Sequence, residues 1–404
     1  MHPGKYLTAR AVAESLGVSV ATVYAYVSRG LIRSEAGADA SKRSRRYLGD
    51  DVQKLLDQKR FRHDPGEAAA SAMHWGAPVL ESALTHITEA GLHYRGQNAI
   101  TLATTSTIEQ VAALMWLGDS ARAHDLFACP PHEILAAIWP QIPRDGLPGQ
   151  RLTIALALAS AHDTAAYDLD LRFGNVAATG ARILALLAAV LADDPGMQAP
   201  IADELARQWC PAQPAARELL SAALILCADH ELNASAFVAR VVASADAHLY
   251  LVVTAGLAAL GGFKHGGHTG LVEAFLSEVG ESAAARQVIS QRLRRGVCIP
   301  GFGHRLYPDG DPRGAALLRL LNAHLPTAPA TALANMVAAE VQRVTGKAPT
   351  IDFGLVALAR AIGLPDGGAL AMFALGRTVG WIGHAIEQYH TGQLIRPRAK
   401  YVGL

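Results

Sequence analysis

Beyond about residue 66 the chain is a succession of apolar segments with helical periodicity, and this pattern restricts the fold more than any other feature. Apolar residues recur at the three- and four-residue spacing of a buried helix face, whereas the alternation typical of strands is almost absent. A short ribbon at 91–96 is the only strand that we expect here. The clearest helical segments are residues 107–117, 154–162, 175–192, 216–228, 234–260 and 368–389. We therefore predict a large, mainly α-helical body.

Composition supports a buried globular protein. Of 404 residues, 51% are hydrophobic and 18% are charged, which is enough for a large core and more than one domain. The four cysteines are scattered without the paired spacing of a metal site or a disulfide scaffold, so we expect a cytoplasmic protein with no metal site. The apolar run at 183–192 is too short to span a bilayer, and no membrane partner is expected.

Residues 1–66 form a separate unit with a helix-turn-helix pattern. Thr8 precedes one apolar helical segment, Gly17 follows it, and Ser19 precedes a second segment. Thr and Ser are favoured helix N-caps because their hydroxyls accept hydrogen bonds from the first free backbone N–H groups. We therefore predict two capped helices joined by a glycine turn.

A strongly basic segment, Lys42-Arg-Ser-Arg-Arg46, follows the two helices. We predict a hairpin wing here and a further helix at 50–62. In this order the elements resemble the winged helix-turn-helix of MerR-type and excisionase-type DNA-binding domains, in which a helix enters the major groove and basic residues neutralise phosphates. DNA contacts are then expected from Thr22, Tyr24, Tyr26, Lys42, Arg43, Arg45 and Arg46. The alternative is a recruited domain that docks on its own protein or on a partner.

The segment from Cys298 to Arg313, with the sequence CIPGFGHRLYPDGDPR, carries the clearest chemical pattern. Its three prolines and its glycines prevent a helix interior and favour a rigid loop that presents His304. An imidazole can polarise a carbonyl oxygen, and the Arg313 guanidinium can bind a carboxylate in bidentate fashion. This pair suits an anionic carbonyl substrate; the alternative is a structural loop with a satisfied histidine.

Four further segments carry candidate residues. His230 lies in a polar cluster, Asp229–Asn233, that ends an apolar helix and either lines a pocket or caps the helix end. His265 lies in a glycine-rich loop before another helix, where a helix N-terminus favours negative charge. His265 and His268 have no third ligand at metal spacing.

Asp352 stands in an apolar setting, which disfavours its charged form, and is either a general base or the N-cap of a helix at 353–362. Arg377 lies in an apolar helix and requires an anionic partner, which is either a protein carboxylate or a substrate. Arg396 stands beside a proline near the C-terminus and is otherwise a surface residue.

The motif Gly301-Phe-Gly-His304, followed by Asp311-Pro-Arg313, resembles the signature of the citrate synthase family. The other segments occur in the family's order, and the resemblance covers about 75–403. It implies a two-lobed helical body, with a large domain at 67–266 and 364–404 and a small domain at 267–363. Catalytic roles fall on His265, His304 and Asp352, and substrate binding falls on His230, Arg313, Arg377 and Arg396. In family dimers the last of these often comes from the other subunit.

The resemblance implies that acetyl-CoA condenses with oxaloacetate, without a permanently bound cofactor, in a homodimer. Asp352 would deprotonate the acetyl thioester, His265 would hydrogen-bond the enol oxygen, and His304 would polarise the oxaloacetate ketone. The close alternative is 2-methylcitrate synthase with propionyl-CoA, since a pocket discriminates weakly against one methylene. An alternative of another class is a DNA-binding regulator whose citrate-synthase-like body senses a metabolite.

One departure from the family pattern concerns the loop of His265. Many members read His-Gly-Gly-Ala-Asn-Glu there, whereas this chain reads His265-Gly-Gly-His268-Thr269-Gly270, with Lys264 in place of an apolar residue. The catalytic histidine is retained while its neighbours change, which bears on acyl and keto-acid specificity.

Overall fold

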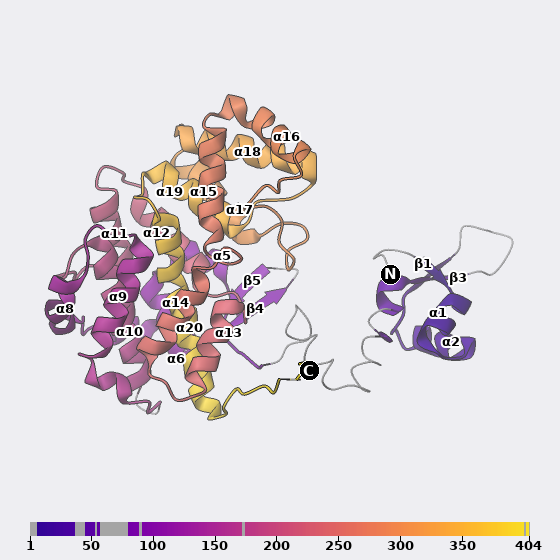
Figure 1. The fold of residues 1–404 in the computed structure, drawn as a ribbon, viewed down its shortest axis with the longest axis horizontal. Helices are drawn as coiled ribbons and strands as arrows, with labels where there is room; N and C mark the ends of the chain where they lie inside the picture. Colours follow the sequence, from indigo (N-terminus) through magenta and orange to yellow (C-terminus); the bar gives the residue numbers. More distant parts are fainter. Residues whose placement is uncertain are drawn as a thin grey trace. The chain divides into compact units, whose positions relative to one another are not determined.

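The computed structural model describes residues 6–36, 45–52, 55–56, 80–88, 91–171, 174–399 and 401–403. The chain forms two compact units, Met1–Glu81 and Ser82–Leu404, which are described separately below (Figure 1).

The N-terminal unit contains two helices and a small antiparallel sheet. Its strands pair in the order β1-β3-β2, with Leu7 opposite Tyr47 and Glu35 opposite Arg46. The elements are β1 (Tyr6–Thr8), α1 (Ala9–Leu16), α2 (Val20–Ser28), β2 (Ser34–Ala36) and β3 (Arg45–Leu48). The pairing of β2 with β3 supplies the predicted hairpin, and its connecting residues lie outside the described part.

Capping explains where the two helices begin. The Thr8 hydroxyl accepts a hydrogen bond from the Ala11 N–H at 3.3 Å, and the Ser19 hydroxyl accepts one from the Thr22 N–H at 3.2 Å. Gly17 ends α1 with a φ of 61°, a conformation that glycine adopts without steric cost. The predicted helix-turn-helix is confirmed.

The larger unit begins with a three-stranded antiparallel sheet in the order β4-β5-β6. Its strands are β4 (Thr85–Thr88), β5 (Gly91–Tyr94) and β6 (Gln97–Asn98). The ribbon expected at 91–96 is present, and β4 pairs with it as a further strand. The sequence did not predict β4, because a four-residue strand gives too short an alternation to recognise.

Helices form the rest of this unit, as predicted. They are α5 (Ala99–Thr105), α6 (Ile108–Leu117), α7 (Ala123–Leu126), α8 (His132–Ile138), α9 (Pro148–Ser160), α10 (Asn175–Ala192), α11 (Ile201–Trp209), α12 (Ala216–Cys227), α13 (Ala234–Ala243), α14 (Leu249–Leu260), α15 (His268–Val279), α16 (Ala285–Arg294), α17 (Pro312–His324), α18 (Pro329–Thr345), α19 (Ile351–Ile362) and α20 (Gly368–Thr391). Short 3-10 turns occur at Ser120–Arg122, Trp139–Gln141, Thr164–Tyr167 and Ser282–Ala284.

The single helix predicted at 234–260 is wrong. The structure has two helices there, α13 and α14, because the chain turns at Asp246, whose φ is 56°. Asp tolerates this left-handed conformation better than most residues. The apolar periodicity continues across the turn because both helices are buried on one side, so the pattern concealed the break.

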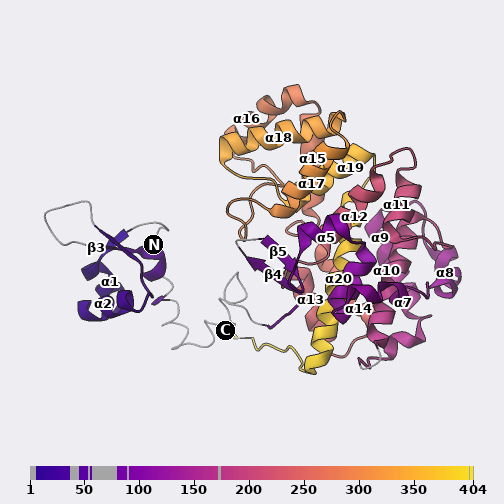
Figure 2. The ribbon, with the colours of Figure 1, turned by 180° about the vertical axis from the view of Figure 1, so that it is seen from behind.

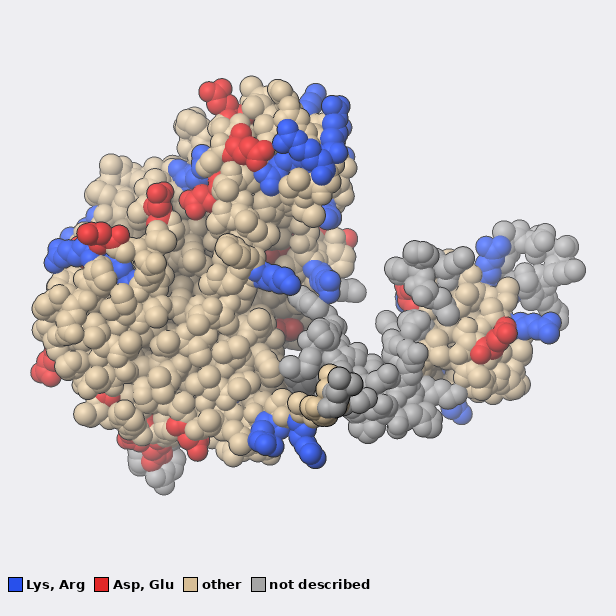
Figure 3. Space-filling model, viewed as in Figure 1, with Lys and Arg blue, Asp and Glu red and all other residues tan. Residues whose placement is uncertain are grey.

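Helix α20 forms the centre of the larger unit, in contact with α10, α12, α13 and α14. Helices α15 to α19 gather at one end of the unit, as the two views from opposite sides show (Figures 1 and 2). On the face seen in Figure 3, Lys and Arg side chains gather over α16 and α18 at that end. Helices α15 to α19 run from His268, where α15 begins, to Ile362, where α19 ends. The boundaries of the small domain at 267 and 363 stay a prediction.

Helices α10 and α20 are long and apolar enough to cross a membrane, but they are core helices of this protein. In the most apolar 18-residue window of each, 83% of α10 and 94% of α20 is buried inside the unit. Their apolar side chains therefore pack against protein.

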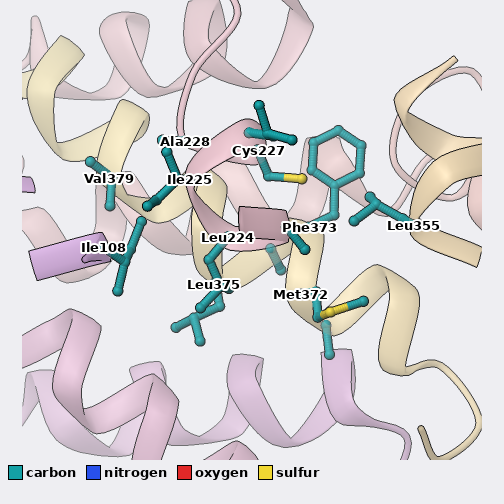
Figure 4. Packing of buried hydrophobic residues seen from close by; sticks show 14 of the residues in the cluster. Ile108, Leu224, Ile225, Cys227, Ala228, Leu355, Met372, Phe373, Leu375 and Val379 are labelled. Atoms are coloured by element: carbon teal, nitrogen blue, oxygen red, sulfur yellow. The ribbon is translucent and has the colours of Figure 1, made fainter. Parts of the chain in front are cut away.

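Two glycines allow α20 to lie directly on α12. A Cβ atom at Gly376 would come within 2.4 Å of the Leu224 carbonyl oxygen, and one at Gly380 within 2.4 Å of the Ala228 oxygen. Figure 4 shows Cys227 of α12 beside Phe373 of α20 in the resulting core. This close approach fixes the position of Arg377, which lies between the two glycines.

Candidate active site

Arg377 is a buried cation, and one of its hydrogen-bond donors is unpaired among the described residues. The side chain is 1% exposed, and its Nε donates a hydrogen bond to the Cys227 carbonyl oxygen at 2.7 Å. Its Nη2 has no hydrogen-bond partner among the described residues. A buried guanidinium normally pairs all its donors, so this one is available for an anion from outside the chain.

His265 is held by a hydrogen-bonded network from the start of α13. Its Nε2 lies 2.7 Å from the Ser235 hydroxyl, which lies 2.8 Å from Oδ1 of Asn233. That amide oxygen already accepts hydrogen bonds from the backbone N–H groups of Ser235 and Ala236. The hydroxyl donates its one proton to that amide oxygen here; when it turns to donate to Nε2 of His265 instead, the ring proton of His265 lies on Nδ1.

The His265 ring is neutral. Burial, together with the positive charges of Arg377 and Arg313, lowers its pKa to about 3. The edge of the ring faces Phe373, with the ring centres 6.0 Å apart, and the Arg377 guanidinium lies 5.1 Å from the same phenyl ring. His265 and Arg377 therefore lie against the same phenyl ring. A neutral imidazole there can donate a hydrogen bond to a developing oxyanion and keep its own charge unchanged.

The signature loop carries His304, which is partly buried. Its Nδ1 accepts a hydrogen bond from the Leu306 N–H at 3.2 Å, so the ring proton of the neutral form lies on Nε2. Burial and the charge of Arg313 lower its pKa. The His304 ring lies 5.2 Å from the His230 ring and 5.1 Å from the Tyr307 ring, centre to centre.

His230 lies under this loop and binds Tyr307. Its Nε2 is 2.9 Å from the Tyr307 hydroxyl, and the side chain is buried. Burial, and then the charges of Arg313 and Arg377, hold the pKa of His230 well below its usual value. Tyr307 is itself neutral, because burial raises its pKa to about 12. The two predicted segments around His230 and His304 are thus joined by one hydrogen bond.

Arg313 is already paired within the chain. Its Nε and Nη2 donate to the two carboxylate oxygens of Asp311 at 3.0 and 2.9 Å, and the residue is 2% exposed. Asp311 also accepts the Ile351 N–H at 3.0 Å, which connects the loop to α19. Burial opposes ionisation of Asp311, but Arg313 and these hydrogen bonds hold its pKa below the ordinary value. The guanidinium is therefore rigid, and it lies 5.8 Å from the Tyr307 ring.

Asp352 lies in the first turn of α19, and the N-cap of that helix is Thr350. The Thr350 hydroxyl donates to Oδ2 of Asp352 at 3.3 Å. Burial raises the pKa of Asp352, while His268 and Arg313 act in the opposite direction. A carboxylate with a raised pKa is a stronger base than an ordinary aspartate, as a general base requires.

These contacts bring six of the seven candidate residues of the body into one region. His265 and Arg377 both contact the Phe373 ring. His230, His304 and Arg313 all lie close to the Tyr307 ring. Asp352 is the residue after Ile351, whose backbone N–H donates to Asp311. Arg396 is the exception, because it is exposed on the segment that follows α20. Two surface hollows of about 550 and 480 Å³, at Trp139 and at Arg294, are lined by other residues.

In the N-terminal unit the predicted DNA-binding residues differ in exposure. Tyr24 is 54% exposed, and Arg45 and Arg46 are exposed on β3. Tyr26 packs against the core of the unit, and the Thr22 hydroxyl is 2.9 Å from that of Ser19. Lys42 and Arg43 lie outside the described residues.

Sequence reasoning missed three residues that hold the site together. Tyr307 and Asp311 are in the signature segment and were passed over, although a phenol and a buried carboxylate beside His304 and Arg313 are natural partners. Ser235 lies two residues after the Asn233 that was noted. No sequence signal links it to His265, 30 positions away.

Comparison with known proteins identifies the family. A family model described as "Citrate synthase, C-terminal domain" matches residues 72–398. The chain belongs to the citrate synthase family. A second model, "Helix-turn-helix domain", matches residues 6–60, so this family member carries an additional N-terminal unit.

Relatives in the family carry two names. The 2-methylcitrate synthase of Mycobacterium tuberculosis (strain H37Rv) is 30% identical over 336 residues, covering 77% of this chain and 84% of that protein. Citrate synthase 2 of Bacillus subtilis is 36% identical over 190 residues, covering 46% of this chain and 51% of that protein. The chain thus spans about half the length of the Bacillus relative, and the specific substrate stays open.

Solved citrate synthases share the fold. The citrate synthase of Thermoplasma acidophilum was solved in a ternary complex with carboxymethyl coenzyme A and oxaloacetate. It aligns with a TM-score of 0.69 and 25% identity, covering 81% of this chain and 94% of that chain. The Thermotoga maritima enzyme aligns with a TM-score of 0.68 and 26% identity over the same shares. The predicted mainly α-helical fold is confirmed.

Proposed function

We propose that this protein is a citrate synthase, which condenses acetyl-CoA with oxaloacetate and hydrolyses the resulting citryl-CoA to citrate and free CoA. The observation that carries the proposal is the neutral His265, whose Nε2 lies 2.7 Å from the Ser235 hydroxyl, in the same region as the unpaired donor of Arg377. A neutral His265 can donate a hydrogen bond to an enol oxygen, and the buried Arg377 cation can bind a carboxylate of oxaloacetate.

The acyl substrate is activated first. Asp352 removes a proton from the methyl group next to the thioester carbonyl, and burial favours this transfer because it destabilises the charged carboxylate. With the Ser235 hydroxyl turned to donate to its Nε2, His265 carries its proton on Nδ1 and donates it to the carbonyl oxygen as the enol forms. His265 remains neutral throughout, since its pKa of about 3 opposes protonation.

Oxaloacetate then receives the enol carbon. The Nε2–H of His304 donates to the ketone oxygen and increases the positive character of the carbon under attack. Arg377 and Arg313 neutralise the carboxylates, and His230 fixes the orientation of the substrate together with Tyr307. Arg313 is already fixed by Asp311, so little side-chain entropy is lost when the substrate binds.

We place the CoA phosphates at the exposed Lys347 and Arg295. The Lys347 side chain crosses the signature loop, since a Cβ atom at Gly303 would lie 3.1 Å from its Cδ. Both cations lie in the part of the chain that includes α16 and α18, where positive side chains gather (Figure 3). Phosphates are attracted by such a basic surface.

We propose a homodimer, which the exposed Arg396 supports. Family dimers bring this residue into the neighbouring subunit's site, where it would supply a third guanidinium for oxaloacetate. The four free thiols fit a reducing, cytoplasmic location. Size-exclusion chromatography with light scattering tests the dimer, and a monomer would contradict it.

The activity test uses the purified full chain with oxaloacetate and either acetyl-CoA or propionyl-CoA. We expect release of free CoA thiol, and mass spectrometry then identifies the product as citrate. Propionyl-CoA giving the higher kcat/KM, with 2-methylcitrate as product, would favour the alternative supported by the Mycobacterium relative. No thiol release with either thioester would refute both assignments.

We also propose that the N-terminal unit binds duplex DNA. The exposed Tyr24 on α2 and the exposed Arg45 and Arg46 on β3 support this second role. Binding by phosphate contacts weakens steeply as salt concentration rises. Fluorescence anisotropy with the full chain and a mixed-sequence duplex should show this slope, and a flat salt dependence would exclude DNA binding.

A further inference from the structure

His268 connects the histidine loop to the signature loop. It is the first residue of α15, and its backbone N–H donates to the His265 carbonyl oxygen at 2.9 Å. Its side-chain Nε2 accepts a hydrogen bond from the Gly301 N–H at 3.1 Å. An alanine here would have no side-chain acceptor, so the link depends on the imidazole.

Gly301 has no room to move from this contact. Its φ is 82°, and a Cβ atom there would lie 2.9 Å from Cγ2 of Val272 and 3.0 Å from Cβ of Phe353. The peptide is thus enclosed between α15 and α19. The N–H and the carbonyl group of Gly301 belong to two successive peptide groups that meet at its Cα, and because the backbone is enclosed there, a hydrogen bond to one group restricts the other.

The second side of Gly301 leads to Asp352. The Gly301 carbonyl oxygen accepts the Thr350 N–H at 2.9 Å, and the Thr350 hydroxyl donates to Oδ2 of Asp352 at 3.3 Å. Beside this contact, the Gly303 N–H donates to the Ala348 carbonyl oxygen at 2.9 Å. The signature loop and the residues before α19 therefore form a short antiparallel pair that ends at the proposed base.

We propose that His268 is a positioning residue for the general base Asp352, acting through the Gly301 peptide. It fixes the position of the signature loop relative to the start of α19. Asp352 and His304 are thereby held in the relative positions that proton removal and condensation require. This inference rests on the proposed condensing activity, and it adds a role that alanine cannot fill.

Three variants test the role. His268→Gln retains an acceptor at similar reach, whereas His268→Met has similar length without one, and His268→Ala serves if the methionine variant does not fold. We expect His268→Met to lower kcat about 10- to 100-fold, since small misplacements of catalytic groups cost this much. The KM for oxaloacetate should stay within about twofold, and His268→Gln should recover most of kcat.

Hydrogen exchange at the Gly301 amide provides a readout that does not depend on catalysis. Loss of one hydrogen bond should accelerate exchange about tenfold in His268→Met and leave it near wild type in His268→Gln. A methionine variant with wild-type kcat, or a glutamine variant as slow as methionine, would overturn the positioning role. If the wild type shows no turnover with either thioester, the proposed function fails, and Gly301 exchange alone decides whether the link exists.

Discussion

The Ser235 hydroxyl lies 2.7 Å from Nε2 of His265, and the proposed mechanism requires it to donate there so that Nδ1 carries the ring proton. Ser235→Ala removes the donor and allows the proton to move to Nε2, so that Nδ1 faces the substrate as an acceptor. We expect kcat to fall about 100-fold, as for other losses of acid–base function. Steady-state kinetics measure this loss. Ser160→Ala, whose hydroxyl only binds a carbonyl of its own helix, should be neutral.

Asp352→Asn should separate activity from stability. The variant lacks the base, and we expect thiol release to fall by at least about 100-fold. The raised pKa of Asp352 means that folding of the wild type is penalised once the carboxylate ionises. The variant should therefore gain about 0.5–2 kcal/mol at neutral pH.

The stability gain of Asp352→Asn has a defined pH dependence. It should be absent below the unfolded carboxyl pKa of about 4 and grow as the pH rises toward the higher folded pKa. Urea unfolding from pH 4 to pH 8 measures this difference. A variant less stable than wild type at pH 8 would contradict burial as the cause of the shift.

Arg377→Gln should weaken oxaloacetate binding. The change removes the buried cation and its unpaired Nη2 donor, and charged hydrogen bonds of this kind contribute about 1.5–3 kcal/mol. We expect the KM for oxaloacetate to rise about 10- to 100-fold, while the KM for the acyl-CoA changes little. Exposed Arg319→Gln is the matched control. An equal rise in both KM values would indicate general damage to the fold.

Asp311→Asn should destabilise the larger unit. It leaves the buried Arg313 without a counter-ion, which costs about 3–5 kcal/mol in comparable buried pairs. Because the folded pKa of Asp311 is lowered, its contribution is present above about pH 4 and is lost as the pH falls through the folded value. Chemical unfolding of wild type and variant should therefore converge at acidic pH. The exposed Asp125→Asn should show no such difference.

The double variant Arg45→Ala and Arg46→Ala tests the N-terminal unit. If both guanidinium groups neutralise phosphates, the slope of log affinity against log salt should decrease in magnitude by about 2. Anisotropy titrations of the full chain at several salt concentrations give this slope. Arg319→Ala should leave it unchanged, and an unaltered slope in the double variant would remove these residues from the interface.

Much of the architecture was predictable because it depends on local sequence. Thr8, Gly17 and Ser19 act within one helical turn, so the helix-turn-helix could be recognised without tertiary information. The helical segments were recognisable because their buried faces repeat at short spacing. The break at Asp246 was not, since a turn between two buried helices keeps the same apolar pattern.

The sequence by itself determined the chemical types at the site: an imidazole on a rigid glycine loop, an aspartate at a helix start and an arginine in an apolar helix. Only the tertiary structure decided their states. Ser235 and His265, or Gly301 and His268, meet across about 30 positions. Protonation and hydrogen-bond direction depend on burial and on such distant partners, which local patterns do not encode.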